Sequence, residues 1–245
     1  MTVYVVGYGG YIGKSLFEYL KARDYRVRGI GRGTPLPMGF EYSDVIVNCA
    51  CRGWKDGDED PFEVAESNIV LPMLLNKRRN GAVMIHLSSG IEEVQPRHPY
   101  SMTKGVASWM MSGIAHVLYL YAVWGGKHVQ MTRYMSSLMK ACAENKPYTI
   151  VTPNHTRDFV HIDTLCALIE SLLSDRYYRI LQVGSGRAIS FLTAFESLKR
   201  VTDRQFPNVR VDASDSSEML YRALHPCLAD TFESDIAKEW KAINA

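Results

Sequence analysis

Short apolar runs alternate with stretches of helical periodicity along most of this chain. Apolar runs predict strands at 2–6, 25–31, 44–48, 81–87, 117–123 and 179–183. Helical periodicity predicts helices at 11–22, 61–79, 101–114, 132–145 and 163–173. Only about a dozen residues separate the second and third strands, so we expect a missing or vestigial crossover helix there. This alternation predicts an α/β fold, a Rossmann-like doubly wound parallel sheet with helices on both faces.

The same pattern divides the chain into two expected domains. Residues 1–125 predict a dinucleotide-binding Rossmann domain, to which residues 150–190 return. Residues 126–149 and 191–245 are expected to form a reduced C-terminal substrate-binding lobe, because helical patterning persists there without a clear order of strands.

Composition and charge narrow the class of protein. The chain has 245 residues, of which 47% are hydrophobic and 22% charged, as is typical of a soluble globular protein. Its net charge of +2 is too balanced to indicate nucleic-acid binding. Polar residues such as Ser112 and His116 interrupt the most apolar stretch, 106–126, so we expect no membrane span. Five cysteines without zinc-ligand spacing favour a reducing cytoplasm and no metal site.

The first predicted strand runs directly into a glycine-rich turn. Gly7, Gly10 and Gly13 follow the strand at three-residue intervals, and a predicted helix begins within the motif. Glycines at these positions let the chain turn sharply and let a pyrophosphate approach the N–H groups of the helix N-terminus. The alternative is an ordinary tight turn, but the order of strand, glycines and helix favours a dinucleotide cofactor.

The end of the second predicted strand bears on the identity of that dinucleotide. Folds that prefer NAD(H) place Asp or Glu there, about 20 residues past the glycines, to hold the ribose hydroxyls. Here the expected acidic position is Gly31, and Arg32 follows it. An arginine can pair with a 2′-phosphate, although Arg32 could also be a solvated surface residue. The sequence therefore favours NADP(H), with NAD(H) possible.

A second motif supplies candidate acid–base chemistry. Tyr100 and Lys104 have the i, i+4 spacing that puts both side chains on one helix face. An ammonium group near a phenol favours the phenolate and lowers a tyrosine pKa from its ordinary value of about 10. Ser88 and Ser89 close the strand that ends at Leu87, where a hydroxyl can donate to a substrate carbonyl. Alone, each feature is ordinary: a helical Tyr–Lys pair, and two serines that begin a loop.

Together these motifs resemble the extended short-chain dehydrogenase/reductase family, in particular its branch of nucleotide-sugar epimerases, dehydratases and reductases. The resemblance covers most of the chain and includes further motifs in the family's order. These are DVIVNCA at 44–50, Asn68, HLSS at 86–89, LYAVWG at 120–125, RDFVHID at 157–163 and LQVGSG at 181–186.

The resemblance implies a role for each matching residue. Those that would bind the cofactor are Gly7, Gly10, Tyr11 and Ile12 along the pyrophosphate, Gly13 of the same motif, and Cys49 and Ala50 beside the adenosine. The implied catalytic residues are Ser89, Tyr100 and Lys104, with Lys104 also binding the nicotinamide ribose and Ser88 as the alternative serine. Arg157 would face the pyrophosphate of a nucleotide sugar, unless it merely pairs with Asp158 or caps a strand.

Departures from the family's usual pattern bear on the reaction. Gly90 and Ile91 follow the serines where the family's 4,6-dehydratases have an Asp–Glu pair, which disfavours dehydration. Ala122 stands where many relatives have asparagine, and is similar to the sugar-nucleotide reductases. We therefore expect an NADP(H)-dependent reductase that acts on a keto group of a nucleotide-linked deoxysugar. A C4 epimerase is the alternative, and a catalytically silent cofactor-binding regulatory protein is the second.

The resemblance also implies a homodimer. Relatives dimerise through the helix that here begins at Ser101, and this helix carries Trp109, Met110 and Met111. These apolar side chains either belong to the core or face a second subunit.

Overall fold

The computed structural model describes residues 1–53, 60–95, 97–128, 133–212, 214 and 220–244. The chain forms two compact units, unit 1 (Met1–Leu120 and Asp163–Gln182) and unit 2 (Tyr121–Ile162 and Val183–Ala245). This division differs from the predicted domains, since residues 121–125, 150–162 and 183–190 lie in unit 2. The reason is strand pairing: in unit 2, β6 (Ala122–Trp124) pairs with β9 (Phe159–His161), and β8 (Thr156–Arg157) pairs with β11 (Ile189–Ser190).

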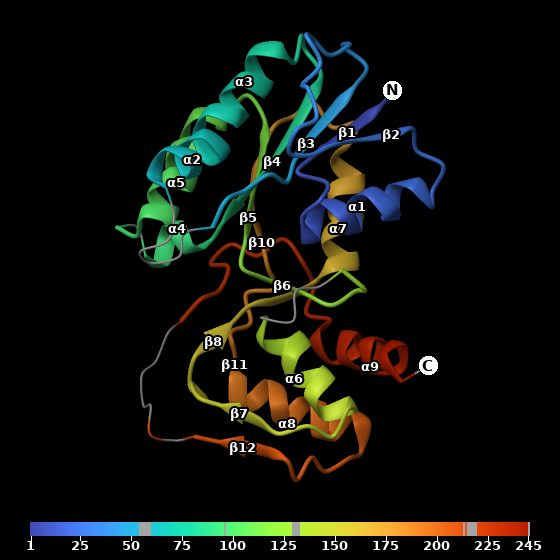
Figure 1. The fold of residues 1–245 in the computed structure, drawn as a ribbon, viewed down its shortest axis with the longest axis vertical. Helices are drawn as coiled ribbons and strands as arrows, with labels where there is room; N and C mark the ends of the chain where they lie inside the picture. The colour runs from blue at the N-terminus through green and yellow to red at the C-terminus, as the bar shows by residue number, and fades with distance from the viewer. Residues whose placement is uncertain (54–59, 96, 129–132, 213, 215–219, 245) are drawn as a thin grey trace. The chain divides into compact units, whose positions relative to one another are not determined.

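A six-stranded parallel sheet forms the centre of unit 1 (Figure 1). Its strands are β1 (Val3–Val6), β2 (Val27–Ile30), β3 (Val45–Asn48), β4 (Val83–Ser89), β5 (His116–Leu120) and β10 (Ile180–Val183). The strand order is β10-β5-β4-β3-β1-β2. The Rossmann-like α/β fold is therefore confirmed. The fully described segment between β2 and β3 contains no helix, as its short length predicted.

Helices cover both faces of this sheet. Figure 1 shows α1 (Tyr11–Lys21) and α7 (Ile162–Leu172) on one face, where Tyr19 donates to Glu170 at 2.9 Å. The helices on the other face are α2 (Pro61–Ala65), α3 (Leu71–Arg78) and α5 (Pro99–Met111), and the short α4 (Ile91–Val94) follows β4. Cover on both faces explains why the central strand β3 is a continuous run of buried residues.

Two predicted elements are broken in the structure. The helix expected at 61–79 contains a π-helical turn, η1 (Glu66–Val70), between α2 and α3. Asn68 in this turn is buried and holds both main-chain polar groups of Arg52, accepting from its N–H at 2.9 Å and donating to its carbonyl at 3.0 Å. The strand expected at 117–123 ends at Leu120, because the chain leaves the central sheet there and continues as β6 in a separate sheet.

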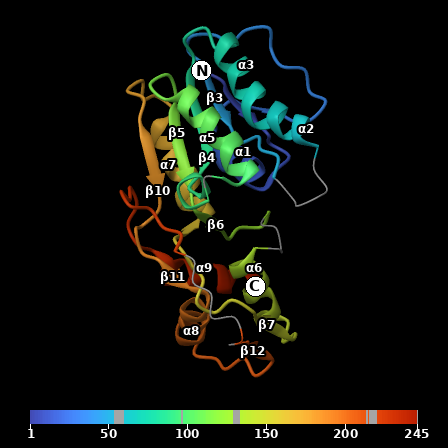
Figure 2. The ribbon, with the colours of Figure 1, turned by 90° about the vertical axis from the view of Figure 1, so that its left-hand side faces the viewer.

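Unit 2 packs three helices around its own apolar core (Figure 2). The helices are α6 (Tyr134–Ala143), α8 (Phe191–Thr202) and α9 (Phe232–Ile243). A further small sheet pairs β7 (Tyr148–Ile150) with β12 (Val209–Val211) in parallel. The apolar face predicted for α6 is confirmed, since Met135, Leu138, Met139 and Cys142 are all buried in this core.

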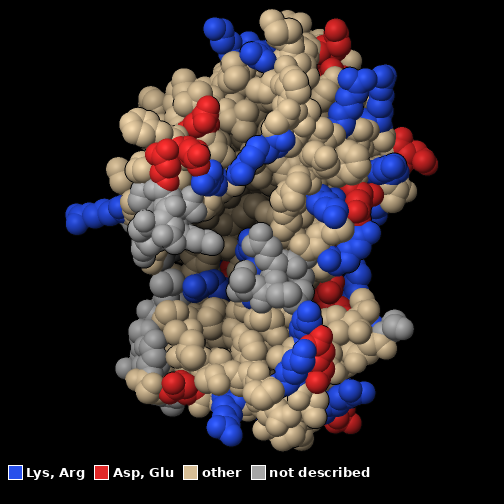
Figure 3. All heavy atoms as spheres, viewed as in Figure 1, with Lys and Arg blue, Asp and Glu red and all other residues tan. Residues whose placement is uncertain are grey.

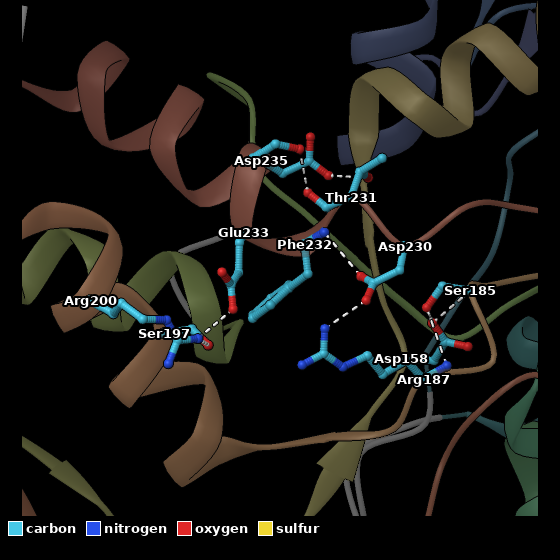
Figure 4. A network of polar contacts seen from close by, with 11 residues as sticks. Asp158, Ser185, Arg187, Ser197, Arg200, Asp230, Thr231, Phe232, Glu233 and Asp235 are labelled. Atoms are coloured by element: carbon cyan, nitrogen blue, oxygen red, sulfur yellow. Dashed lines mark hydrogen bonds and ion pairs between the residues drawn. The ribbon is translucent and has the colours of Figure 1, made fainter.

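A buried carboxylate fastens three segments of unit 2. Asp158, with 0% of its surface exposed, accepts from the N–H and hydroxyl of Ser185 at 2.9 and 3.0 Å (Figure 4). It also accepts from the N–H groups of Gly186 at 2.8 Å and Ala223 at 3.1 Å. A Cβ at position 184 would lie 2.3 Å from Asp158 Oδ2, so only glycine fits there. Hydrogen bonds compensate for burying this charge.

We expect Asp158→Ala to lower the free energy of unfolding by about 3 kcal/mol, because it leaves several buried N–H groups unpaired. Urea unfolding followed by tryptophan fluorescence measures the loss. Asp230→Ala is the control: it removes a 2.7 Å ion pair between the partly exposed Asp230 and Arg187, together with one 3.2 Å hydrogen bond from the N–H of Phe232 (Figure 4). Such a surface pair contributes at most about 1 kcal/mol. Equal losses in the two variants would contradict the role of Asp158.

Candidate functional site

The glycine turn between β1 and α1 has no room for a side chain at Gly7 or Gly13. Gly7 has a φ of +80°, and a Cβ there would lie 2.6 Å from the main chain of Ala50. A Cβ on Gly13 would lie 2.3 Å from the carbonyl oxygen of Gly7. Gly10 is the N-cap of α1, whose start has no side-chain cap and no acidic residue. The N–H groups around Tyr11 and Ile12, together with the positive end of the helix dipole, therefore fit a pyrophosphate.

The segment after β3 lies against this turn and against α5. Ala50 is the residue that excludes a side chain at Gly7. Burial raises the pKa of the Cys49 thiol, which makes it a poor nucleophile. Cys51 is exposed, and its thiol donates to the Tyr100 hydroxyl at 3.3 Å. Asn68 stabilises this arrangement, because it holds the main chain of Arg52 and also donates to Thr103 on α5 at 3.1 Å.

Ser89, Tyr100 and Lys104 lie on β4 and α5 of unit 1. Lys104 is buried, and its ammonium group donates at 2.6 Å to the carbonyl of Leu87 on β4. Tyr100 lies one helical turn before Lys104 and is partly exposed. Ser101 donates at 3.5 Å to the carbonyl of Ile91, so the start of α5 contacts the turn that follows Ser89. The structure thus brings the three predicted catalytic residues to the carboxyl end of β4.

The two candidate serines differ in their surroundings. Ser88 is buried, donates to the carboxylate of Glu92 and accepts from the hydroxyl of Ser108 at 2.6 Å. Ser89 is partly exposed, and its hydroxyl oxygen accepts from the N–H of Ile91 at 3.4 Å. Ser88 is therefore engaged in the interior, and Ser89 is the better candidate for contact with a substrate.

Sequence reasoning missed Glu92. Its Oε1 accepts from the hydroxyls of Ser88 and Ser108 and from the N–H of Ser89, the last at 3.4 Å. Burial raises the pKa of Glu92, while these hydrogen bonds and the ammonium of Lys104 oppose the rise. Glu92 thus holds the turn that carries Ser89. Its contacts with Ser88 and Ser89 are local, and Ser89-x-x-Glu92 has the S-x-x-E spacing typical of a helix start, which is a signal that could have indicated the contact with Ser89. The contact with Ser108 on α5 has no such local signal.

Sequence reasoning also missed Tyr8, which lies between Gly7 and Gly10 of the glycine motif. Gly31 and the exposed Arg32 follow β2 directly, as expected. The ring of Tyr8 lies over the end of this strand, because a Cβ on Gly29 would lie 2.5 Å from its Cγ and one on Gly31 would lie 3.0 Å from its Cε1.

Arg157 lines a cavity of about 390 Å³ in unit 2. Its guanidinium carbon lies 5.4 Å from the centroid of the Phe191 ring and 5.3 Å from that of Tyr221, and burial lowers its pKa. Arg157 donates to the carbonyl of Thr156 at 2.8 Å, whereas Asp158 is occupied by main-chain donors. The other charged or aromatic residues of the lining are Tyr121, Trp124, Arg133, Tyr134, Tyr148 and Phe159. Aromatic walls and two guanidinium groups suit a nucleoside diphosphate.

Other features of the surface are ordinary. Lys and Arg side chains lie among Asp and Glu side chains on the face drawn in Figure 3. All five cysteines are free. Among the described residues, no three His, Cys, Asp or Glu side chains gather as metal ligands. No helix in the described part of the chain has the length and apolar character that crossing a membrane requires.

The environment of Glu92 makes stability depend on pH. Because its pKa is raised above the unfolded value of 4.5, the folded state binds more protons between the two pKa values. The free energy of unfolding therefore falls as the pH rises through this window. Glu92→Gln has no carboxyl group to titrate, so its free energy of unfolding does not fall in this window, and its amide keeps an accepting oxygen. We expect its stability relative to wild type to increase from about pH 4 to about pH 7 in urea unfolding. A constant difference would contradict this, and Glu196→Gln controls for the loss of a surface charge.

Comparisons with known proteins agree with this fold. The family model described as "NAD dependent epimerase/dehydratase family" matches residues 3–184. Similar solved structures include UDP-glucose 4-epimerase of Thermus thermophilus in complex with NAD, at 16% identity and a TM-score of 0.74, over 100% of this chain and 99% of that chain. The Thermotoga maritima UDP-glucose 4-epimerase with UDP-glucose has 15% identity and a TM-score of 0.74, over 98% of both chains.

A third similar structure is a point mutant of UDP-glucuronic acid 4-epimerase from Bacillus cereus, in complex with NAD and UDP-4-deoxy-4-fluoro-glucuronic acid. It has 16% identity and a TM-score of 0.73, over 99% of both chains. Identities this low establish a shared fold, whereas the family model covers most of this chain. The chain therefore belongs to the NAD dependent epimerase/dehydratase family.

Proposed function

We propose that this chain is an NAD(P)-dependent epimerase that inverts carbon 4 of a nucleotide-linked sugar. The observation that carries the proposal is the arrangement of Tyr100 and Lys104 on α5, with the lysine bound to the β4 main chain just before Ser89. Membership of the epimerase/dehydratase family supports it. The similar structures named as 4-epimerases favour this reaction over the reductase expected from the sequence.

The three residues supply what such a reaction needs. A dinucleotide held at the glycine turn before α1 would supply the hydride chemistry, as acceptor from the sugar carbon and donor to its opposite face. Tyr100 takes the hydroxyl proton as the carbonyl forms and gives it back as the hydride returns, so the cycle needs no further oxidant. Ser89 donates a hydrogen bond to the same oxygen. Lys104 favours the phenolate through its charge, and the Leu87 carbonyl fixes the position of the ammonium group.

The lining of the cavity in unit 2 favours a substrate that carries a nucleoside diphosphate group. Arg157 and Arg133 supply planar donors for phosphate oxygens, and the surrounding rings supply apolar surface for a base. The Thermotoga maritima structure is described with UDP-glucose, so uridine diphosphate sugars are the first substrates to test.

The cofactor is NAD(H) or NADP(H). Gly31 and the exposed Arg32 favour a 2′-phosphate, while the solved structures named above include complexes with NAD. The reductase stays a second candidate because a small residue, Ala122, lines the cavity of unit 2. Against dehydration, Glu92 is bound to Ser88 and Ser108 rather than free to act on a substrate.

We expect Tyr100→Phe to lower kcat about 1,000-fold, since it removes the acid–base group, while cofactor affinity stays nearly unchanged. The assay incubates the protein with UDP-glucose or UDP-glucuronic acid and follows the C4 epimer by NMR. Tyr177→Phe, a change at an 82% exposed tyrosine, is the control. Stoichiometric oxidation of NADPH by a keto-sugar nucleotide would instead indicate the reductase. Bound cofactor without either turnover would indicate the catalytically silent protein.

We also propose that a second copy of this chain covers the outer face of α5. Met102, Val106 and Trp109 lie on successive turns of this helix and are 58%, 44% and 81% exposed. Phe62 on α2 is 85% exposed. Exposed apolar side chains that gather on one face are typical of a protein interface.

We expect the wild type to sediment as a dimer and Trp109→Glu to sediment as a monomer, because burying an unpaired carboxylate in an apolar interface is costly. Analytical ultracentrifugation at micromolar concentration measures the mass. Tyr177→Glu introduces the same charge at another exposed aromatic residue and should leave the dimer intact. A monomeric wild type would overturn the proposal.

A further inference from the structure

Tyr8 lies where the two halves of a dinucleotide site meet. It follows Gly7 in the turn that fits the pyrophosphate, and its ring spans the end of β2 from Gly29 to Gly31. In folds of this class, the residue at the end of the second strand holds the adenosine ribose. The Tyr8 ring therefore lies at the adenosine end of the site, between the phosphate position and the ribose position.

The ring and the glycines of β2 depend on each other. A Cβ at position 29 would lie 2.5 Å from Cγ and 2.8 Å from both Cδ atoms of Tyr8, so any side chain there would displace the ring. A Cβ at position 31 would lie 3.0 Å from Cε1. An Asp or Glu at position 31, the usual ligand of the ribose hydroxyls, does not fit beside the ring without moving it. Tyr8 thus takes the space that such a carboxylate would need.

The ring is supported from the helix side and open to solvent. Phe17 on α1 packs beside it, with ring centroids 5.8 Å apart and an interplanar angle of 47°. Tyr8 nevertheless remains 39% exposed. An exposed aromatic surface beside a phosphate-binding turn offers a stacking platform for a nucleobase.

We infer that Tyr8 binds the adenosine half of the dinucleotide and sets its specificity: the ring replaces the ribose-binding carboxylate, so a 2′-phosphate is accepted. Affinity that other dinucleotide folds draw from a carboxylate on the ribose comes here from stacking on the ring. No negative charge at position 31 repels the 2′-phosphate, and Arg32 lies beside this position. The inference rests on the proposed function only in that the chain binds a dinucleotide.

The test measures binding of NADH and NADPH by cofactor fluorescence, without any substrate. We expect the wild type to bind NADPH at least as tightly as NADH. Tyr8→Ala should weaken both cofactors about tenfold or more, as loss of a base-stacking ring does, whereas Tyr8→Phe keeps the ring and should stay within about twofold of wild type. Tyr8→Ala/Gly31→Asp should favour NADH over NADPH about tenfold, because the carboxylate holds the ribose and repels the phosphate.

Two variants distinguish loss of base stacking from loss of a side chain that covers the glycines of β2. Tyr8→Leu keeps an apolar side chain over β2 but has no ring, so it should weaken binding like the alanine variant while its melting temperature stays near that of wild type. Tyr42→Ala is the matched control. Tyr42 also covers a glycine, since a Cβ on Gly81 would lie 2.7 Å from its Cδ2, but this glycine precedes β4. Its loss should not alter either affinity.

The outcomes distinguish this inference from the proposed function. Unchanged affinities in Tyr8→Ala and Tyr8→Leu, or a wild type that prefers NADH more than about tenfold, would overturn the role of Tyr8 and leave the proposed epimerase intact. Normal cofactor binding without epimerisation would overturn the proposed function and leave the role of Tyr8 intact. A wild type that binds neither cofactor would overturn both.

Discussion

The close approach of main chains at the carboxyl edge of the central sheet is the constraint on which unit 1 depends. Gly7 comes so near Ala50, and Gly13 so near the carbonyl of Gly7, that no side chain fits at either glycine. This contact joins the ends of β1 and β3 to the start of α1. It leaves the first N–H groups of α1 without a side-chain cap, which is the condition for binding a phosphate. Larger residues here would disturb the fold and the candidate cofactor site together.

Buried polar groups then place the parts that face a ligand. Asn68 holds the main chain of Arg52 and the hydroxyl of Thr103, so the segment after β3 stays beside α5. Glu92 holds the turn after β4. In unit 2, Asp158 holds the segment that contains Ser185. Each group is costly to bury and stable only when all its hydrogen bonds form. Such groups tie loop geometry to the intact fold, which preorganises a site.

The sequence predicted the regular parts of this structure well, because local periodicity and glycine chemistry determine them. The strands that became β1 to β4 and the apolar face of α6 needed no information beyond neighbouring residues. The break at Tyr121 was missed because the apolar run continues through it while the strand pairing changes. The roles of Glu92 and Tyr8 were also missed. The contact of Glu92 with Ser108 and the contact of Tyr8 with the glycines of β2 join segments distant in the sequence, whereas the contact of Glu92 with Ser89 has the local S-x-x-E spacing.

The candidate chemistry is divided between the two units, with Ser89, Tyr100 and Lys104 in unit 1 and Arg157 in unit 2. Ser89 pairs with Leu120 at the last position of β4 and β5, and the N–H of Gly90 donates to the carbonyl of Leu120 at 2.8 Å. The next two residues, Tyr121 and Ala122, line the cavity that contains Arg157. The end of β5 therefore belongs to the strand pair that carries the candidate serine, and the residues that follow it along the chain line the cavity of unit 2.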